Sequence, residues 1–217
     1  MKAKTLKHAV TSFFTAIKTK NIVPIEHIVD DAKVLDKKVA LITGGSGGIG
    51  YAIAKSFIES GCHVIITGTN AEKLKSCVEK LGDSSKGIFV SQKIAKYFVE
   101  NKIKGHILNI SSSTGGEPGW LAYRISKQAI ENLTLGLAQK LSPYGIFVNG
   151  IAPGSTATNL LNYKDGDSIA TRDNVIGRMV MPDEIATYAK MLVSDLGNMV
   201  VGETIYISGG RGKFDIR

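Results

Sequence analysis

Short strand-like runs alternate with segments of helical periodicity along most of this chain. Runs of strand length lie at residues 39–42, 63–67, 105–111 and 203–208. Between them, apolar residues recur every three or four positions, as on the buried face of a helix. These series are Ile49, Ile53 and Phe57; Ile94 and Phe98; Ile130, Leu133, Leu137 and Leu141; and Ile185, Tyr188, Ala189 and Leu192. The alternation predicts an α/β fold with a doubly wound parallel sheet of the Rossmann type.

The first 36 residues differ from the rest and predict a helical extension with a connector. Leu6, Val10 and Ile17 recur at helical spacing between lysines, and no acidic residue precedes Glu26. A basic amphipathic helix can lie on a membrane surface, or it can dock on its own domain or on a second subunit. Docking is the preferred interpretation. The length of 217 residues then favours a single domain over residues 37–217.

A glycine-rich turn joins the first strand to the first helix. It satisfies the pattern G-x-G-x-x-G with Gly45, Gly47 and Gly50, and it also contains Gly44 and Gly48. Glycines let the backbone approach a pyrophosphate, and the positive end of a helix attracts that charge. A tight strand-to-helix turn needs glycine for geometry as well. Dinucleotide binding is the favoured interpretation, with a purely structural turn as the alternative.

A tyrosine and a lysine four residues apart follow the strand at residues 105–111 and a serine-rich loop. Tyr123 and Lys127 are then neighbours on one helix face. Tyrosine has an ordinary pKa of about 10, and an adjacent ammonium favours the phenolate, which suits acid–base catalysis. The same spacing occurs at Tyr51 and Lys55. That pair belongs to the helix after the glycine turn and is expected to lie on the surface.

Composition narrows the class of protein further. The formal charge is +8, but it is spread over single lysines rather than a basic stripe, so no nucleic-acid role is expected. No apolar stretch approaches the roughly 20 residues that span a bilayer. Cys62 and Cys77 lack the spacing of a metal site, and no metal is expected. Two free thiols favour a reducing compartment and a cytoplasmic location.

Together, these segments resemble the short-chain dehydrogenase/reductase family over residues 37–210. The resemblance rests on five stretches in this order: residues 43–50 (TGGSGGIG), 109–115 (NISSSTG), 123–127 (YRISK), 148–154 (VNGIAPG) and 202–210 (GETIYISGG). It implies an NAD(P)-dependent oxidoreductase that moves a hydride between nicotinamide and a carbonyl or alcohol substrate. It also implies a homo-oligomer, as relatives tend to be.

The resemblance assigns roles to individual residues. Tyr123 would be the acid or base, Lys127 would lower its pKa and hold the nicotinamide ribose, and Ser112 would orient the carbonyl. The implied cofactor-binding residues are Gly44, Ser46, Gly48, Ile49, Gly50, Thr69, Tyr123, Lys127, Pro153, Gly154, Thr156 and Thr158. Gly68 and Thr69 stand where an acid would hold the ribose of NAD, so NADP is favoured, with NAD possible. The polar segment 159–180 stands where the family has a substrate lid.

The sequence departs from the family after the helix at 71–81. The third and fourth strands of the family and its Asn-Asn-Ala-Gly motif are absent, which predicts an internal deletion around residues 84–86. Ser84 stands about where the asparagine of the family's catalytic tetrad would fall. Either the first strand pairs directly with residues 105–111, or the fold is damaged there. An alternative function follows: a catalytically impaired remnant that acts as a binding or interaction protein.

Overall fold

The structure is a computed structural model that describes residues 33–68, 70–81, 85–86 and 92–214. The predicted N-terminal helix, Thr69 and Ser84 lie outside the described residues. The strands in chain order are β1 (Val39–Thr43), β2 (His63–Thr67), β3 (Ser85–Lys86), β4 (Gly105–Ile110), β5 (Ile146–Pro153) and β6 (Thr204–Ile207). The described α-helices are α2 (Gly48–Glu59), α3 (Ala71–Leu81), α4 (Gln92–Glu100), α5 (Ala122–Leu141) and α6 (Pro182–Val193).

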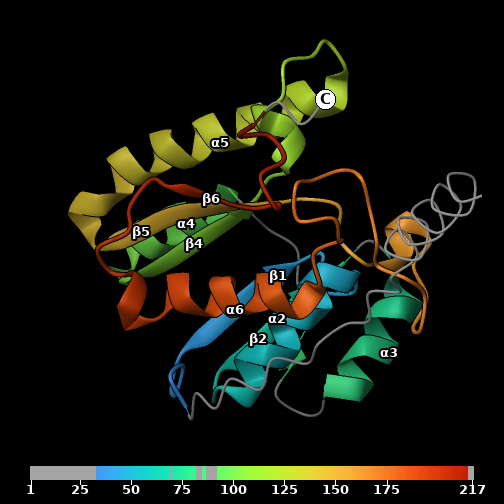
Figure 1. Ribbon diagram of the computed structural model, residues 1–217. Helices are drawn as coiled ribbons and strands as arrows, with labels where there is room; N and C mark the ends of the chain where they lie inside the picture. The colour runs from blue at the N-terminus through green and yellow to red at the C-terminus, as the bar shows by residue number, and fades with distance from the viewer. Residues whose placement is uncertain (1–32, 69, 82–84, 87–91, 215–217) are drawn as a thin grey trace, which may run out of the picture.

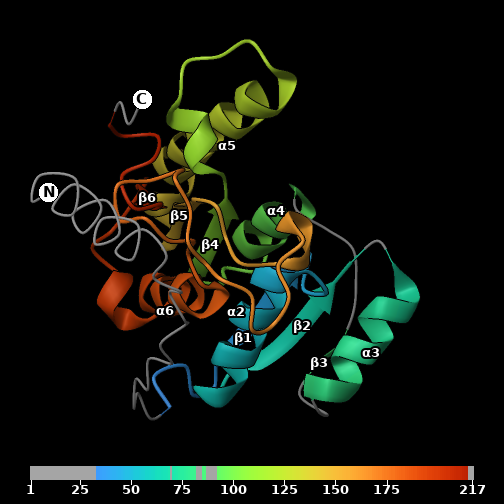
Figure 2. The ribbon, with the colours of Figure 1, turned by 45° about the vertical axis from the view of Figure 1, so that its right-hand side comes forward.

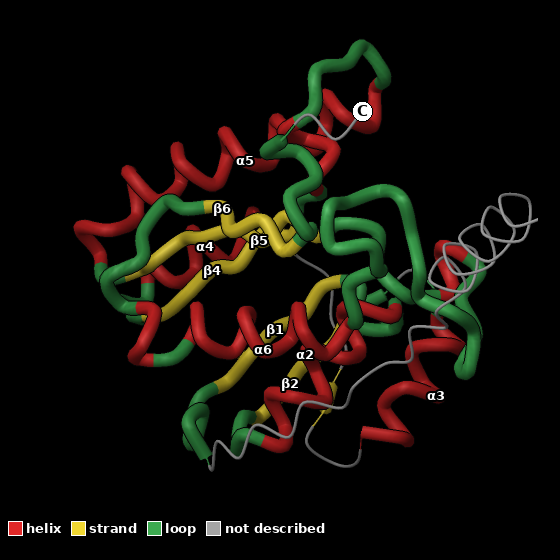
Figure 3. Tube along the Cα trace, in the orientation of Figure 1, coloured by secondary structure: helices red, strands yellow, loops and turns green. Residues whose placement is uncertain are grey.

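The described strands form two separate parallel sheets rather than one. Their orders are β1-β2-β3 and β4-β5-β6, and every pairing is parallel. β1 and β4 are edge strands of different sheets, and Figures 1 and 3 show the two groups of strands apart. The fold is thus a parallel α/β fold of the Rossmann type, as predicted. Of the two alternatives for the first strand, direct pairing with residues 105–111 does not occur, and the interruption between β1 and β4 agrees with the other, a fold damaged at this place.

One hydrophobic core crosses the division between the sheets. It contains Phe57 of α2, Ile66 of β2, Ile151 of β5, and Ile185 and Leu192 of α6, all buried. Helix α6 packs against α2 and also against β4 and β5, and Figure 2 shows α6 beside both groups of strands. Burying each such side chain contributes about 1.5–3 kcal/mol. Helix–helix packing therefore joins the sheets where strand pairing does not.

The two sheets are covered differently. The β4-β5-β6 sheet has α6 on one face, and on the other a second cluster in which Phe98 of α4 packs with Ala138 of α5 and Val148 of β5. Along β1, Ala40 and Ile42 pack on the core, whereas Val39 is 69% exposed. The face of β1 that carries Val39 is left to solvent. Among the described residues, only the β4-β5-β6 sheet is therefore covered on both faces.

Three smaller expectations are corrected. The buried stripe of α5 is Thr134, Ala138 and Leu141, and Leu133 is exposed, because a helix of 3.6 residues per turn presents the neighbouring stripe to the sheet. Tyr188 of α6 is also exposed. The two-residue β3 pairs with β2, although the third strand of the family was expected to be absent. Among the described helices, none is both long and apolar enough to cross a membrane.

Candidate functional site

The glycine-rich turn carries the chain from β1 into α2 by backbone geometry that side chains would block. Gly44 has a φ of +68°, in the left-handed region that favours glycine. A Cβ at Gly50 would collide with the carbonyl oxygen of Gly44. Gly47 precedes α2, and no side chain caps the helix. The first-turn amides of α2, which have no partner within the helix, are therefore left to an anionic ligand.

The segment after β5 lies directly against this turn. A Cβ at Gly48 would fall 2.6 Å from Cγ2 of Thr158, so Gly48 and Thr158 are in contact. Gly154 is fixed by its amide, which donates to the carbonyl of Ile207 at 2.9 Å. The hydroxyl of Thr156 donates to the carbonyl of Gly154 at 2.9 Å. The structure thus brings together the turn with Gly44, Ser46, Gly48, Ile49 and Gly50, and the segment with Pro153, Gly154, Thr156 and Thr158.

Ser112, Tyr123 and Lys127 come from the end of β4 and the start of α5. Ser112 caps the 3-10 helix η1 (Ser113–Gly116), and its Oγ is 3.0 Å from Oγ1 of Thr114. Lys127 Nζ lies 5.5 Å from the centre of the Tyr123 ring and 3.4 Å from the carbonyl oxygen of Ile110. Tyr123 is 57% exposed. Its ring is thus open to a substrate, with the ammonium beside it.

The sequence analysis did not predict a polar cluster formed by Ser111, Glu131 and Tyr206. The Ser111 hydroxyl donates to the carbonyl oxygen of Lys127 at 2.8 Å and contacts Glu131 Oε1 at 3.1 Å. The Tyr206 hydroxyl of β6 donates to Glu131 Oε2 at 2.8 Å. Burial, and then the hydrogen bond to Glu131, raise the pKa of Tyr206, which stays protonated. The cluster ties the lysine-bearing turn of α5 to β4 and β6.

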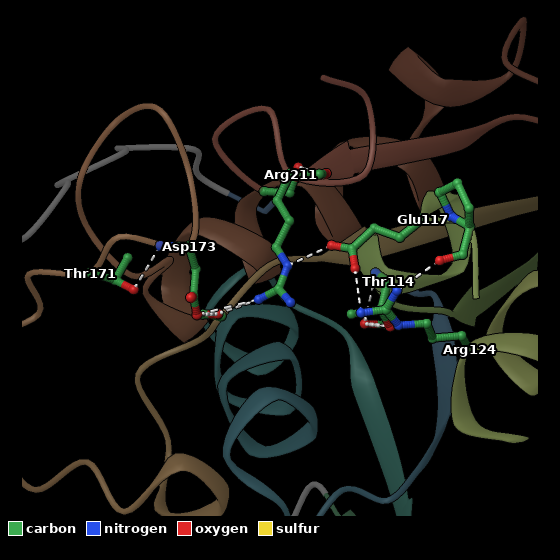
Figure 4. Close-up of polar contacts among 10 residues, drawn as sticks. Thr114, Glu117, Arg124, Thr171, Asp173 and Arg211 are labelled. Atoms are coloured by element: carbon green, nitrogen blue, oxygen red, sulfur yellow. Dashed lines mark hydrogen bonds and ion pairs between the residues drawn. The ribbon is translucent and has the colours of Figure 1, made fainter. Parts of the chain in front are cut away.

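A second network, which includes Arg211 after β6, was also missed by the sequence analysis. Glu117 follows η1 and forms ion pairs with Arg124 of α5 at 3.0 Å and with Arg211 at 2.8 Å. Arg211 also pairs with Asp173 of the 159–180 segment at 3.3 Å. Figure 4 shows Arg211 between Asp173 and Glu117. The two ion pairs of Arg211 join residues far apart in the sequence, so no local pattern predicts them.

Hydrogen bonds and ion pairs tie the 159–180 segment to itself and to α6. The buried Asn174 side chain accepts hydrogen bonds from the amides of Ile176 and Gly177 and donates to the carbonyl oxygen of Arg178. Two guanidinium nitrogens of Arg178 donate to the two carboxylate oxygens of Glu184 in α6, at 2.6 and 2.8 Å. Arg178 is therefore engaged within the protein, whereas Arg172 is exposed.

Two family models match the chain. A model described as enoyl-(acyl carrier protein) reductase matches residues 83–211, more than half of the chain. A model described as short chain dehydrogenase matches residues 38–93. The chain belongs to the short-chain dehydrogenase/reductase family. The family's glycine turn, serine loop and tyrosine–lysine pair are thus the features that the structure arranges at the carboxyl ends of β1 and β4.

Several relatives are similar over nearly their whole length. A 3-oxoacyl-(acyl-carrier-protein) reductase of Rickettsia felis is 30% identical over 236 residues, covering 81% of this chain and 97% of that protein. An L-rhamnose 1-dehydrogenase (NADP+) of Thermoplasma acidophilum is 28% identical, covering 80% and 95%. The crystal structure of a Brucella melitensis 3-ketoacyl-(acyl-carrier-protein) reductase complexed with NADH has a TM-score of 0.69 at 24% identity, covering 82% and 99%, which supports the fold.

The alignment with the Rickettsia felis reductase contains more positions than this short-chain dehydrogenase/reductase contributes residues to it. The aligned part is 81% of 217 residues, or about 176, whereas the alignment runs over 236. About 60 positions therefore have no counterpart here. Together with the two unpaired edges of β1 and β4, this supports the predicted internal deletion, which remains a prediction.

Proposed function

We propose that this protein is an NAD(P)-dependent oxidoreductase that acts on a carbonyl or alcohol substrate. The observation that carries the proposal is the contact of Gly48 with Thr158, which brings the glycine turn against the segment after β5, the strand that pairs with β4. A dinucleotide would lay its pyrophosphate on the uncapped start of α2. The 3-oxoacyl reductases among the relatives make an acetoacetyl thioester a suitable probe substrate.

In the proposed reaction, Tyr123, Ser112 and Lys127 would have different roles. A bound nicotinamide would supply or accept the hydride. Tyr123 would give a proton to the carbonyl oxygen, or take it from the alcohol, and Ser112 would donate a hydrogen bond to the same oxygen. Lys127, whose Nζ lies 5.5 Å from the centre of the Tyr123 ring, would hold the ribose. The carbonyl oxygen of Ile110 and the Ser111–Glu131–Tyr206 cluster would keep Lys127 in place.

The fit of the cofactor is uneven. The pyrophosphate end is well provided, since Gly44, Gly48 and the uncapped α2 form a cradle that side chains would fill. The adenine end is less well provided, because no described strand pairs with β1 on the side toward β4. Gly68 follows β2 with no carboxylate in the position that would repel a 2′-phosphate. This favours NADP over NAD, with Thr69 as a further contact.

The remaining proposals concern assembly and location. We propose a homo-oligomer in the cytoplasm, with no nucleic-acid partner. Exposed apolar side chains on α4 and α5, which include Tyr97, Ile125 and Leu133, supply a surface that a second copy would cover. The spread of the positive charge and the free Cys62 and Cys77 support the rest.

The chain contains its own control for the catalytic assignment. Tyr123→Phe should lower turnover of an acetoacetyl thioester at least 100-fold, because it removes the transferable proton, while the affinity for NADPH stays within about twofold. Tyr51→Phe removes the same hydroxyl from the other tyrosine–lysine pair and should leave turnover unchanged. Turnover is followed by nicotinamide absorbance and affinity by nucleotide fluorescence. Equal turnover in the two variants would contradict the assignment of Tyr123.

The division of the sheet favours one alternative, an impaired remnant that binds a partner. β1 is an edge strand among the described strands, and an edge strand leaves backbone donors and acceptors unpaired beside the proposed dinucleotide site. Against it stand the complete Ser112, Tyr123 and Lys127 set and the ordered networks around it. A folded protein that binds neither NADPH nor NADH would favour the remnant.

A further inference from the structure

Four charged side chains of alternating sign run from α5 to the 159–180 loop. In order they are Arg124, Glu117, Arg211 and Asp173 (Figure 4). We propose that Arg211 is a positioning residue that couples the 159–180 loop to the turn bearing Tyr123. The coupling rests on the proposed oxidoreductase function for its meaning, but its structural part can be measured without a substrate.

Arg211 contacts both partners with different atoms of one guanidinium. Its Nε lies 2.8 Å from Glu117 Oε1, while its Nη1 lies 3.3 Å from Asp173 Oδ2 and donates to Ser155 Oγ at 3.1 Å. The Ser155 hydroxyl in turn donates to Asp173 at 2.6 Å. Ser155 follows Gly154 in the segment proposed to line the nicotinamide. A single fork therefore holds three segments of the site in one arrangement.

The backbone of Arg211 is fixed, so the fork is a firm reference point. The Ser208 hydroxyl at the end of β6 donates to the carbonyl oxygen of Arg211 at 2.8 Å. Gly212 has a φ of +80°, and a Cβ there would collide with the carbonyl oxygen of Ser113 in η1. The chain around Arg211 is thus packed against the serine loop by its backbone as well as by its side chain.

The two ends of the network differ in exposure. Side chains of Glu117 and Arg211 are 21% and 23% exposed, whereas that of Asp173 is 51% exposed. Water screens the Asp173 pair more, so this contact is the weaker one and releases first. At the other end, Glu117 also binds Arg124, the neighbour of Tyr123 along α5. Release of the loop alone therefore leaves Glu117 paired with both Arg211 and Arg124, whereas removal of Arg211 leaves Glu117 paired with Arg124 alone.

This difference in exposure predicts that Asp173→Asn and Arg211→Gln have different effects on KM and kcat. Asp173→Asn should free the loop alone, raising KM for the acetoacetyl thioester about threefold with kcat within twofold. Arg211→Gln should loosen both sides, raising KM similarly and lowering kcat about tenfold or more. Arg211→Lys supplies a point charge that reaches the shielded Glu117 but not both partners, so it should restore most of kcat and leave KM high.

The loop itself is followed by hydrogen exchange in the nucleotide-free protein, so a failure of the enzyme function cannot hide the result. Amides in residues 168–177 should exchange at least threefold faster in Asp173→Asn and Arg211→Gln than in the wild type. Arg172→Gln removes an exposed guanidinium next to Asp173 and should change neither exchange nor kinetics.

The outcomes are separable. Arg211→Gln and Asp173→Asn that both exchange at the rate of Arg172→Gln would overturn the coupling. A wild type that turns over no substrate while the exchange differences appear would reject the oxidoreductase proposal and keep the coupling. Should Arg211→Gln fail to fold, Arg211→Lys and Asp173→Asn decide: kcat and KM that change together in both variants would reduce Arg211 to a general stabilising contact.

Discussion

His106 lies near the start of β4, where its Nδ1 is shielded from solvent and has no hydrogen-bond partner among the described residues. Its ring packs beside that of Phe147, with centres 5.5 Å apart. Burial, and then the charge of Lys38, lower the pKa of His106, while Asp195 opposes them. Lys38 and Asp195 form an ion pair of 3.1 Å between the residue before β1 and the turn after α6. A protonated His106 would therefore carry a charge in a half-buried position near the ammonium of Lys38.

A lowered pKa makes stability fall with acid. The unfolded chain keeps the ordinary pKa of about 6.5, so below that pH it binds more protons than the folded protein does. The free energy of unfolding should therefore decrease from about pH 7 to pH 5, by less than about 1 kcal/mol because His106 is only half-buried. His106→Phe should flatten this part of the Tm profile.

The exposed His63 supplies the control for this prediction. His63→Phe should keep the wild-type slope of Tm against pH between about pH 7 and pH 5. If His106→Phe keeps that slope as well, the proton uptake that drives acid destabilisation occurs elsewhere in the protein.

At the scale of elements, α6 is the helix on which both sheets depend. Its start was predictable, since Pro182 in the first turn with Asp183 and Glu184 is a local signal. The sequence pattern did not predict the partners of Glu184. Its carboxylate accepts a hydrogen bond from the amide of Met181 at 2.8 Å and two more from the guanidinium of Arg178. The carboxylate thereby closes the helix onto the end of the 159–180 loop.

Glu184→Gln should destabilise the protein by about 1–2 kcal/mol, because it weakens the cap and leaves the guanidinium of Arg178 without its charged partner. The free energy of unfolding is measured by urea titration. Asp183→Asn changes an exposed carboxylate in the same turn and should cost less than about 0.5 kcal/mol. A loss as small in Glu184→Gln as in Asp183→Asn would show that α6 does not depend on this cap.

Elements were easier to predict than their pairing. β1, β2 and α2 appear where the apolar periodicity placed them, because that periodicity is a local property. Whether β1 pairs with β4 depends instead on contacts between residues far apart in the sequence, which no local pattern encodes. In the same way, the spacing of Tyr123 and Lys127 predicted that the two side chains are neighbours, whereas the ion pairs of Arg211 could be found only from the structure.

At the scale of the whole molecule, the two halves of the site have unequal support. The half with Ser112, Tyr123 and Lys127 rests on a sheet covered on both faces and on two polar networks. The half that would hold the adenine rests on β1, which has an open edge and an exposed Val39. The central claim is that α6 and α2 hold these halves closely enough for one cofactor to bind across them.

A titration with NADPH and then NADH, followed by nucleotide fluorescence and by Tm, tests that claim most directly. Ligand that binds only the folded state must raise Tm, so saturable binding of NADPH should bring a rise of a few degrees, with NADH binding more weakly. Gly48→Ala, whose Cβ would press on Thr158, should lose most of both effects. A cooperatively melting protein with no binding and no rise in Tm would contradict the account and leave the binding remnant as the better description.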